Sequence, residues 1–257
     1  MSASTQSGGG RHDAWWTAAS WLREIAIVVV GALVASTLLR LFVAQMFVIP
    51  SGSMENTLLI RDRVAVQKIV GFQRGDIVVF RDTEDWLAPA KVEDDPVKKA
   101  LIFVGLAPDE SSNHLIKRVI GVEGDHVTCC DARGRVTVNG TALNEGEYLY
   151  TDPVTGRQVE PSSVSFDVVV PAGTVFVMGD HRNDSADSRC HLNDPTDGEP
   201  AGSMAFIPVE NIVGTAIAVV YPFDRFHGIS RPRTFENIPA GGTPPDAPVL
   251  TGPKVVC

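Results

Sequence analysis

The sequence has little positive charge to offer a polyanion. Its 257 residues include 22 Lys and Arg against 31 Asp and Glu, so the formal net charge is −9 and the isoelectric point lies near 5.1. Binding to nucleic acid depends on cationic side chains that neutralise phosphates, and the chain has no basic stripe for this purpose. We therefore expect no nucleic-acid partner.

Cysteine and metal-binding motifs are also scarce. The four cysteines are Cys129, Cys130, Cys190 and Cys257, and none forms a C-x-x-C pair, so no structural zinc site is expected. No H-E-x-x-H motif exists, and we expect neither a metal nor another cofactor. If the domain lies outside the cytoplasm, the pattern favours one disulfide, between Cys190 and either Cys129 or Cys130. Adjacent cysteines rarely pair, and Cys257 is in a terminal tail.

Long apolar runs are limited to one. Ile25 to Leu39 is uncharged, and its fifteen residues would span about 22 Å as a helix, less than the ~30 Å of a bilayer core. Extension to Ala44 supplies the missing length and includes Arg40, whose charge can reach the headgroups. The run predicts a single-pass transmembrane anchor over 25–44 in the lipid bilayer, after a short flexible leader over 1–24.

Two other interpretations of this run are weaker. A cleaved signal peptide needs a small-residue site after the apolar run, and Val34-Ala35-Ser36 comes too early. A buried soluble helix is apolar on one face, whereas this run is apolar all round. Charge does not orient the anchor, because arginines flank both ends. The small leader and the large following domain favour a domain on the extracytoplasmic side of the cell membrane.

After the anchor, β-type signals dominate. Short β-branched runs alternate with turn residues, which predicts one all-β, mainly antiparallel domain over 45–227 on the helical anchor. Residues 81–113 break the pattern and are interpreted as an insertion, while the Pro- and Gly-rich residues 228–257 predict a mobile tail. Asn139-Gly140 predicts a two-residue hairpin turn. The predicted strands are Arg63–Val70, Asp76–Phe80, Leu115–Val122, His126–Thr128, Arg135–Val138, Ser165–Val170, Thr174–Met178 and the apolar run within Phe206–Tyr221.

A serine-containing turn follows the anchor directly. In Ile49 to Asp62, Ser51 and Ser53 bracket Gly52, and Pro50 precedes them. Proline biases the backbone toward an extended entry, and glycine allows a tight turn and close approach of another backbone. A serine on such a turn can point its hydroxyl outward, although an ordinary Ser/Gly loop is the simpler interpretation of this stretch alone.

A nucleophilic serine needs a base to remove its proton. Of the six histidines, His181 has the best setting for this role, and it is a weak one. In Leu115–Val122, alternate side chains share a face, so either Lys117 or Arg118 should point toward the core. Burial can lower the pKa of a lysine from about 10.4 by the ~2 to 3 units that a base near neutral pH needs, whereas arginine stays charged. Lys117 is therefore the stronger candidate base, and a lysine that reaches water from an edge strand is the alternative.

A third polar segment is GDHRNDSADSR, Gly179 to Arg189. Asp187 and Arg189 could pair and hold this loop, and Ser185 could exchange a hydrogen bond with a nearby amine. An acidic turn with surface ion pairs is the alternative interpretation.

These stretches together resemble a known family, the bacterial type I signal peptidases (leader peptidases), which are membrane-anchored Ser-Lys endopeptidases. The likeness covers roughly Ile25 to Pro222 outside the insertion, and the order of the motifs and the preceding anchor also agree. It implies a signal-peptidase-type β domain. The motifs are PSGSMENTL (50–58), RGDIVVF (74–80), IKRVIGVEGD (116–125) and MGDHRNDSADSR (178–189).

The resemblance implies a role for each matching residue. Ser53 corresponds to the nucleophile and Lys117 to the general base, so we expect their side chains within hydrogen-bond distance. The Ser53 backbone N–H and the Ser51 hydroxyl correspond to the oxyanion hole. Ser185 corresponds to the serine that orients the lysine, with Asp187 and Arg189 bracing the loop. Asp184 departs from the Asn found in many members, and we expect its carboxylate to point outward.

The resemblance also implies the substrates. They are secretory preproteins, cut after small residues at positions −1 and −3, and Met54 and Ile116 are the candidates for the wall of the substrate pocket. Two alternatives remain: a Ser-Lys protease acting on itself or on one dedicated partner, and a non-enzymatic anchored β-domain for binding. Acylation of the serine and cleavage of a range of preproteins would distinguish them.

Overall fold

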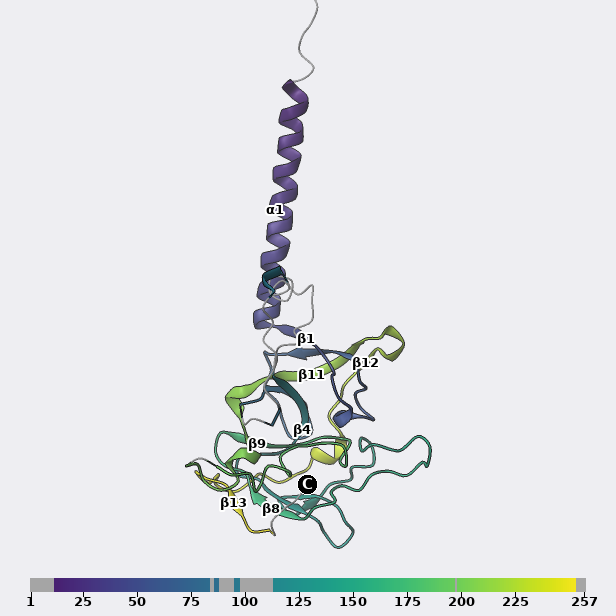
Figure 1. The fold of residues 1–257 in the computed structure, drawn as a ribbon, viewed down its shortest axis with the longest axis vertical. Helices are drawn as coiled ribbons and strands as arrows, with labels where there is room; N and C mark the ends of the chain where they lie inside the picture. Colours follow the sequence, from purple (N-terminus) through teal and green to yellow (C-terminus); the bar gives the residue numbers. More distant parts are fainter. Residues whose placement is uncertain (1–11, 84–85, 88–94, 98–112, 197, 253–257) are drawn as a thin grey trace, which may run out of the picture.

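The computed structural model describes residues 12–83, 86–87, 95–97, 113–196 and 198–252. Within these ranges, one long helix leads into a body of two antiparallel sheets (Figure 1). The predicted all-β class on an N-terminal helix is confirmed.

Helix α1, His12–Phe42, stands away from the sheets (Figure 1), and the large apolar side chains between Trp21 and Leu38 that the structure describes are largely exposed. Its stretch Ser20–Leu38, 19 residues with a mean hydropathy of 1.8, is long and apolar enough to cross a membrane, and none of it is buried against the described chain. A bilayer would remove this apolar surface from water. The span overlaps the predicted anchor but begins five residues earlier. Contrary to the predicted flexible leader, residues 12–24 are helical, because their alanines and leucine favour helix propagation.

The larger sheet carries the polar segments singled out in the sequence. Its strand order is β1-β2-β11-β3-β4-β9-β10, with β12 paired to β11, and neighbouring strands run antiparallel. Strand β4 lies between β3 and β9, so most of its side chains are buried. The strands are β1 Ala44–Val48, β2 Arg63–Gln67, β3 Ile77–Arg81, β4 His114–Val122, β9 Thr174–Met178, β10 Ile207–Pro208, β11 Ile212–Tyr221 and β12 His227–Gly228.

The smaller sheet has the order β13-β8-β5-β6-β7. The predicted Asn139-Gly140 turn joins β6 to β7, with φ values of 51° and 76° that suit a tight hairpin turn. Strand β5 pairs antiparallel with β6. The strands are β5 His126–Cys129, β6 Thr137–Val138, β7 Thr141–Ala142, β8 Phe166–Val169 and β13 Val249–Leu250.

The Pro- and Gly-rich C-terminal segment is packed, contrary to the predicted mobile tail. Phe235 is 5% exposed and belongs to the main core cluster, and β13 pairs with β8. Glycine also allows close backbone approach, since the Gly242 N–H donates to the Gly124 carbonyl at 2.9 Å. Composition alone therefore misjudged residues 228–252, and residues 253–257 lie outside the described ranges.

Two further sequence predictions concern the disulfide and the insertion. A disulfide joins Cys129 to Cys130, so the expected pairing of Cys190 with either of them is wrong. Cys190 lies on the loop after β9, with its Sγ 3.9 Å from the Ser185 carbonyl oxygen, whereas Cys129 ends β5 in the other sheet. Most of the predicted insertion lies outside the described residues. Its described Trp86 donates an Nε1–H to the Met204 carbonyl at 2.8 Å.

Candidate active site

The serine turn is fixed by buried neighbours on both sides. Ile49, Met54 and Leu58 are at most 1% exposed and belong to one core cluster with side chains of β2, β3 and β4. The Ile49 N–H donates to the Asp62 carbonyl at 2.9 Å, which ties the entry of the segment to its exit. Between these anchors, residues Gly52–Met54 form a single 3₁₀ turn, η1, that presents Ser53 at 6% exposure.

Lys117 projects from β4 toward this turn. Its side chain is 2% exposed, and its Nζ lies 2.6 Å from the Ser53 Oγ. This is the hydrogen-bond distance that the sequence led us to expect. The two groups come from segments 64 residues apart in the chain, and the sheet brings them together.

Burial lowers the pKa of Lys117 from its ordinary 10.5 to about 8. The carboxylates of Asp187 and Asp180 act in the opposite direction and limit this fall, while Arg189 adds to it. At a pKa of about 8, roughly a tenth of the amines are neutral at pH 7, enough for a lysine to act as a base.

The segment Gly179–Arg189 forms the third side of the site through a buried ion pair. Arg189 Nε and one terminal nitrogen donate to the two oxygens of Asp187, each at 2.8 Å. Burial alone would raise the pKa of Asp187, but the Arg189 guanidinium, the Gly179 N–H and the Ser185 hydroxyl together outweigh it and lower the pKa. The Ser185 hydroxyl donates to Asp187 Oδ2 at 2.8 Å. The Asp184 side chain is 70% exposed, so it points outward as expected.

Gly179 is a site residue that the sequence did not single out. A Cβ at this position would lie 2.5 Å from the Ser53 carbonyl oxygen and 2.3 Å from the Ser185 Oγ. Only glycine therefore lets the strand end of β9 pass between the serine turn and the third segment. The glycine that opens the polar GDHRNDSADSR motif was the available signal.

Known proteins similar to this chain are signal peptidases. Residues 21–221 match the family model "Signal peptidase, peptidase S26". The signal peptidase I of Mycobacterium tuberculosis is 38% identical over 233 residues, which cover 80% of this chain and 75% of that relative. The probable signal peptidase I of Mycobacterium leprae is 37% identical over 242 residues, 82% of this chain and 80% of that relative. The chain belongs to the signal peptidase family, peptidase S26.

A solved signal peptidase I structure from Enterococcus faecalis V583 was also found. It is 20% identical, superposes with a TM-score of 0.33, and covers 57% of this chain and 97% of that one. Family membership rests on the sequence relationships.

In this signal peptidase family member, a buried network links the base strand to the serine segment. Arg118 Nε and a terminal nitrogen donate to Asp180 at 2.8 and 2.6 Å, and the Thr57 hydroxyl donates to Asp180 Oδ2 at 2.5 Å. Asp180, which follows β9, therefore links β4 to the turn after η1 that contains Thr57. The sequence showed each residue within a motif but not that they meet.

Three further predicted site residues have different outcomes. The Ser51 hydroxyl lies 3.4 Å from the Ser53 Oγ, at the edge of the dyad. Met54 has no exposed surface and is part of the core, so its predicted place in a pocket wall is not observed. Ile116, next to Lys117, keeps 7% exposure.

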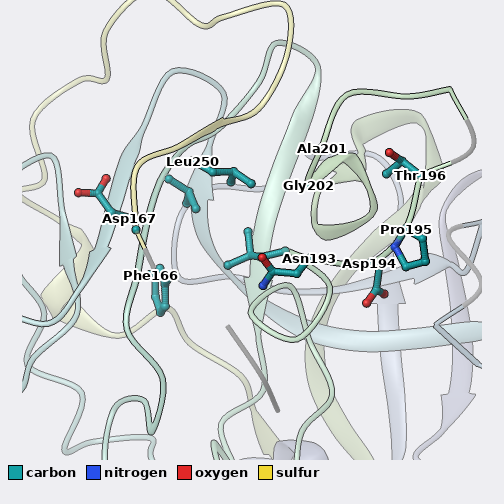
Figure 2. A pocket seen from close by; sticks show the side chains of 12 residues that line it. Phe166, Asp167, Asn193, Asp194, Pro195, Thr196, Ala201, Gly202 and Leu250 are labelled. Atoms are coloured by element: carbon teal, nitrogen blue, oxygen red, sulfur yellow. The ribbon is translucent and has the colours of Figure 1, made fainter. Parts of the chain in front are cut away.

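A cavity of about 400 Å³ lies elsewhere, between the smaller sheet and the loop before β10. Figure 2 shows Asp167 and Leu250 on one side and Asp194, Pro195 and Thr196 on the other. No candidate site residue lines this cavity, so its size is not an argument for catalysis. Among the described residues, no group of three or more His, Cys, Asp or Glu is placed to hold a metal ion.

Proposed function

We propose that this chain is a membrane-anchored serine endopeptidase that removes N-terminal signal peptides from secretory preproteins. Its membership of the signal peptidase family supports the reaction. The observation that carries the chemistry is the buried Lys117 amine, 2.6 Å from the Ser53 hydroxyl.

Ser53 is the proposed nucleophile and Lys117 its general base. The neutral amine takes the proton from the Ser53 Oγ as that oxygen attacks the scissile carbonyl carbon. The resulting ammonium then returns the proton to the leaving amine as the peptide bond breaks. A water molecule then attacks the acyl-enzyme while the lysine accepts its proton, and this proton passes to the Ser53 Oγ as the ester bond breaks.

The Ser53 backbone N–H and the Ser51 hydroxyl are the proposed oxyanion donors. Such donors stabilise the charge that develops on the carbonyl oxygen in the tetrahedral intermediate. The Ser51 hydroxyl oxygen lies 3.4 Å from the Ser53 Oγ, which supports this, because the oxyanion forms on the carbonyl group that the Ser53 Oγ attacks. Asp187 and Arg189 hold the loop that carries Ser185, whose proposed role is to support the lysine.

The proposed substrate is an extended preprotein segment with small residues at −1 and −3. An extended peptide can bind as an added strand beside a sheet edge, with shallow pockets selecting small side chains. Ile116 is the remaining candidate for a pocket wall. A panel of preproteins with Ala-x-Ala cleavage sites tests how many substrates the enzyme accepts. A protease that acts only on itself or on one dedicated partner would leave most of the panel uncut.

We further propose that the catalytic domain over 45–227 lies on the extracytoplasmic side, where secreted preproteins emerge. A reporter enzyme that is active only outside the cytoplasm, fused after residue 257, should be active. An inactive fusion, with an active one at the N-terminus, would reverse the assigned topology.

Replacement of the dyad residues tests the function itself. Ser53→Ala and Lys117→Ala should each abolish cleavage of a preprotein in detergent while leaving the melting transition cooperative. Ser203→Ala is the control and should cleave normally. The Ser203 hydroxyl donates to the Pro200 carbonyl, three residues earlier in the chain. Full activity of either dyad variant refutes the mechanism.

A further inference from the structure

His181 contacts both peptide groups that flank the proposed nucleophile. Its backbone N–H donates to the Ser53 carbonyl at 3.1 Å. Its imidazole Nδ1 lies 3.3 Å from the Gly52 carbonyl oxygen. One residue of the loop after β9 therefore holds the serine turn from the main chain and from the side chain.

The surroundings of the imidazole define which nitrogen carries a proton. Nδ1 faces the Gly52 carbonyl oxygen and, at 3.4 Å, the Glu55 carboxylate, and both are acceptors. Nδ1 must therefore carry a hydrogen and donate it. The ring stacks on Tyr150 with centroids 3.7 Å apart, and the side chain is only 12% exposed, so its orientation is fixed.

The geometry of the peptide bond gives this contact a consequence for catalysis. The Gly52 carbonyl and the Ser53 N–H belong to one planar trans peptide group, so they point in opposite directions. A donor that holds the carbonyl on the His181 side directs the N–H away from that side. The Ser53 N–H is the proposed oxyanion donor.

We propose that His181 is a positioning residue that aims the Ser53 N–H at the oxyanion of the substrate, an inference that rests on the proposed function. The Gly52 carbonyl also accepts the Glu55 N–H at 2.9 Å, as part of η1. Without the imidazole, the Gly52–Ser53 peptide therefore keeps the hydrogen bond from Glu55, and its orientation becomes less restricted. The expected loss in kcat is about tenfold, less than the 10²- to 10³-fold typical when an oxyanion donor is removed.

Substitutions at position 181 separate this role from a merely structural one. In His181→Ala the backbone bond to Ser53 remains, and kcat should fall about tenfold with KM changed less than twofold. His181→Asn can place its side-chain N–H near the position of Nδ1 and should restore kcat to within about threefold of wild type. His181→Gln places its amide one bond farther out and should not.

His191→Ala is the matched control. The His191 side chain is 13% exposed, stacks on Trp86 and bonds Asp194, so it resembles His181 in burial and packing. Among the described residues, the His191 side chain contacts Trp86 and Asp194 and not the serine turn. This variant should keep the kcat of wild type, and a loss equal to that of His181→Ala would overturn the inference.

The kinetics are measured on the full-length chain in detergent with one peptide containing a preprotein cleavage site. Wild-type kcat in His181→Ala, or equal kcat values for the Asn and Gln variants, overturns the positioning role. If His181→Ala does not fold, the comparison of Asn with Gln decides. Ser53→Ala is measured alongside: activity in that variant refutes the proposed function, whereas its inactivity leaves the test of His181 independent.

Discussion

Lys117 and Arg118 are consecutive on β4, and both side chains are buried, at 2% and 1% exposure. Their environments differ. Arg118 forms a two-bond ion pair with Asp180, whereas the Lys117 amine lies against a serine hydroxyl. The ion pair with Asp180 compensates the cost of burying the Arg118 guanidinium. Burial instead lowers the pKa of the Lys117 amine. The sequence predicted that one of the two would face the core, and the central position of β4 buries both.

Replacement of Lys117 by methionine should stabilise the protein at neutral pH. The fall in pKa from 10.5 to about 8 corresponds to about 3 kcal/mol of cost for burying the charged amine. Below pH 8 the lysine is charged in both the folded and unfolded states, so the full cost applies. Chemical denaturation in detergent at pH 7 should show a higher free energy of unfolding for Lys117→Met.

That advantage should shrink as the pH rises from 8 to 10.5. Over this range the folded wild type loses its proton before the unfolded chain does, so its free energy of unfolding increases. A constant difference between the two proteins across this range would contradict a lowered pKa.

The cleavage rate should depend on pH in the same range. The base is active only as the neutral amine, so kcat/KM should rise about tenfold per pH unit below pH 8 and level off above it. Initial rates with a preprotein peptide between pH 6 and 9.5 provide the measurement. A plateau already reached at pH 6.5 would indicate a different base.

Gly179→Ala should inactivate the enzyme by displacing the catalytic groups. The added methyl would meet the Ser53 carbonyl oxygen at 2.5 Å, and a shift of about 1 Å in a reacting group can cost on the order of 10²-fold in rate. Gly146→Ala is the control, since its added methyl would meet its nearest atoms at 3.7 Å. If both alanine variants cleave equally well, the close approach at Gly179 is not required.

The Asp187–Arg189 ion pair should contribute strongly to stability. Asp187→Asn leaves the Arg189 guanidinium buried at 2% exposure without its charged partner, which typically costs about 3–5 kcal/mol. Asp184→Asn, at a carboxylate that is 70% exposed, should change the free energy of unfolding by no more than about 0.5 kcal/mol. Denaturant midpoints for the two variants would be compared, and equal midpoints would rule out the bracing role.

The sequence indicated the elements of the site better than their contacts. Alternating β-branched runs predicted the strands that carry Lys117 and Met178, because side-chain periodicity is a local property. The motifs also indicated Ser53 and the Asp187–Arg189 pair. The place of Gly179 between two serines depends on distances across the sheet, which no local pattern contains.

Packing also overrode composition at the C-terminus. Proline and glycine predicted a mobile tail, but Phe235 supplies an apolar side chain to the core and β13 supplies a strand to the smaller sheet. The cysteine pairing was also mispredicted, because adjacent cysteines rarely pair and Cys129 was therefore not expected to bond to Cys130.

Direct titration of the Lys117 amine tests the central claim, that this side chain is uncharged often enough to act as a base. NMR of lysine side chains labelled at Cε, with Lys117→Met used to assign the signal, gives its pKa in the folded protein. The account predicts titration near pH 8. A signal that titrates at 10.5 or above would contradict it.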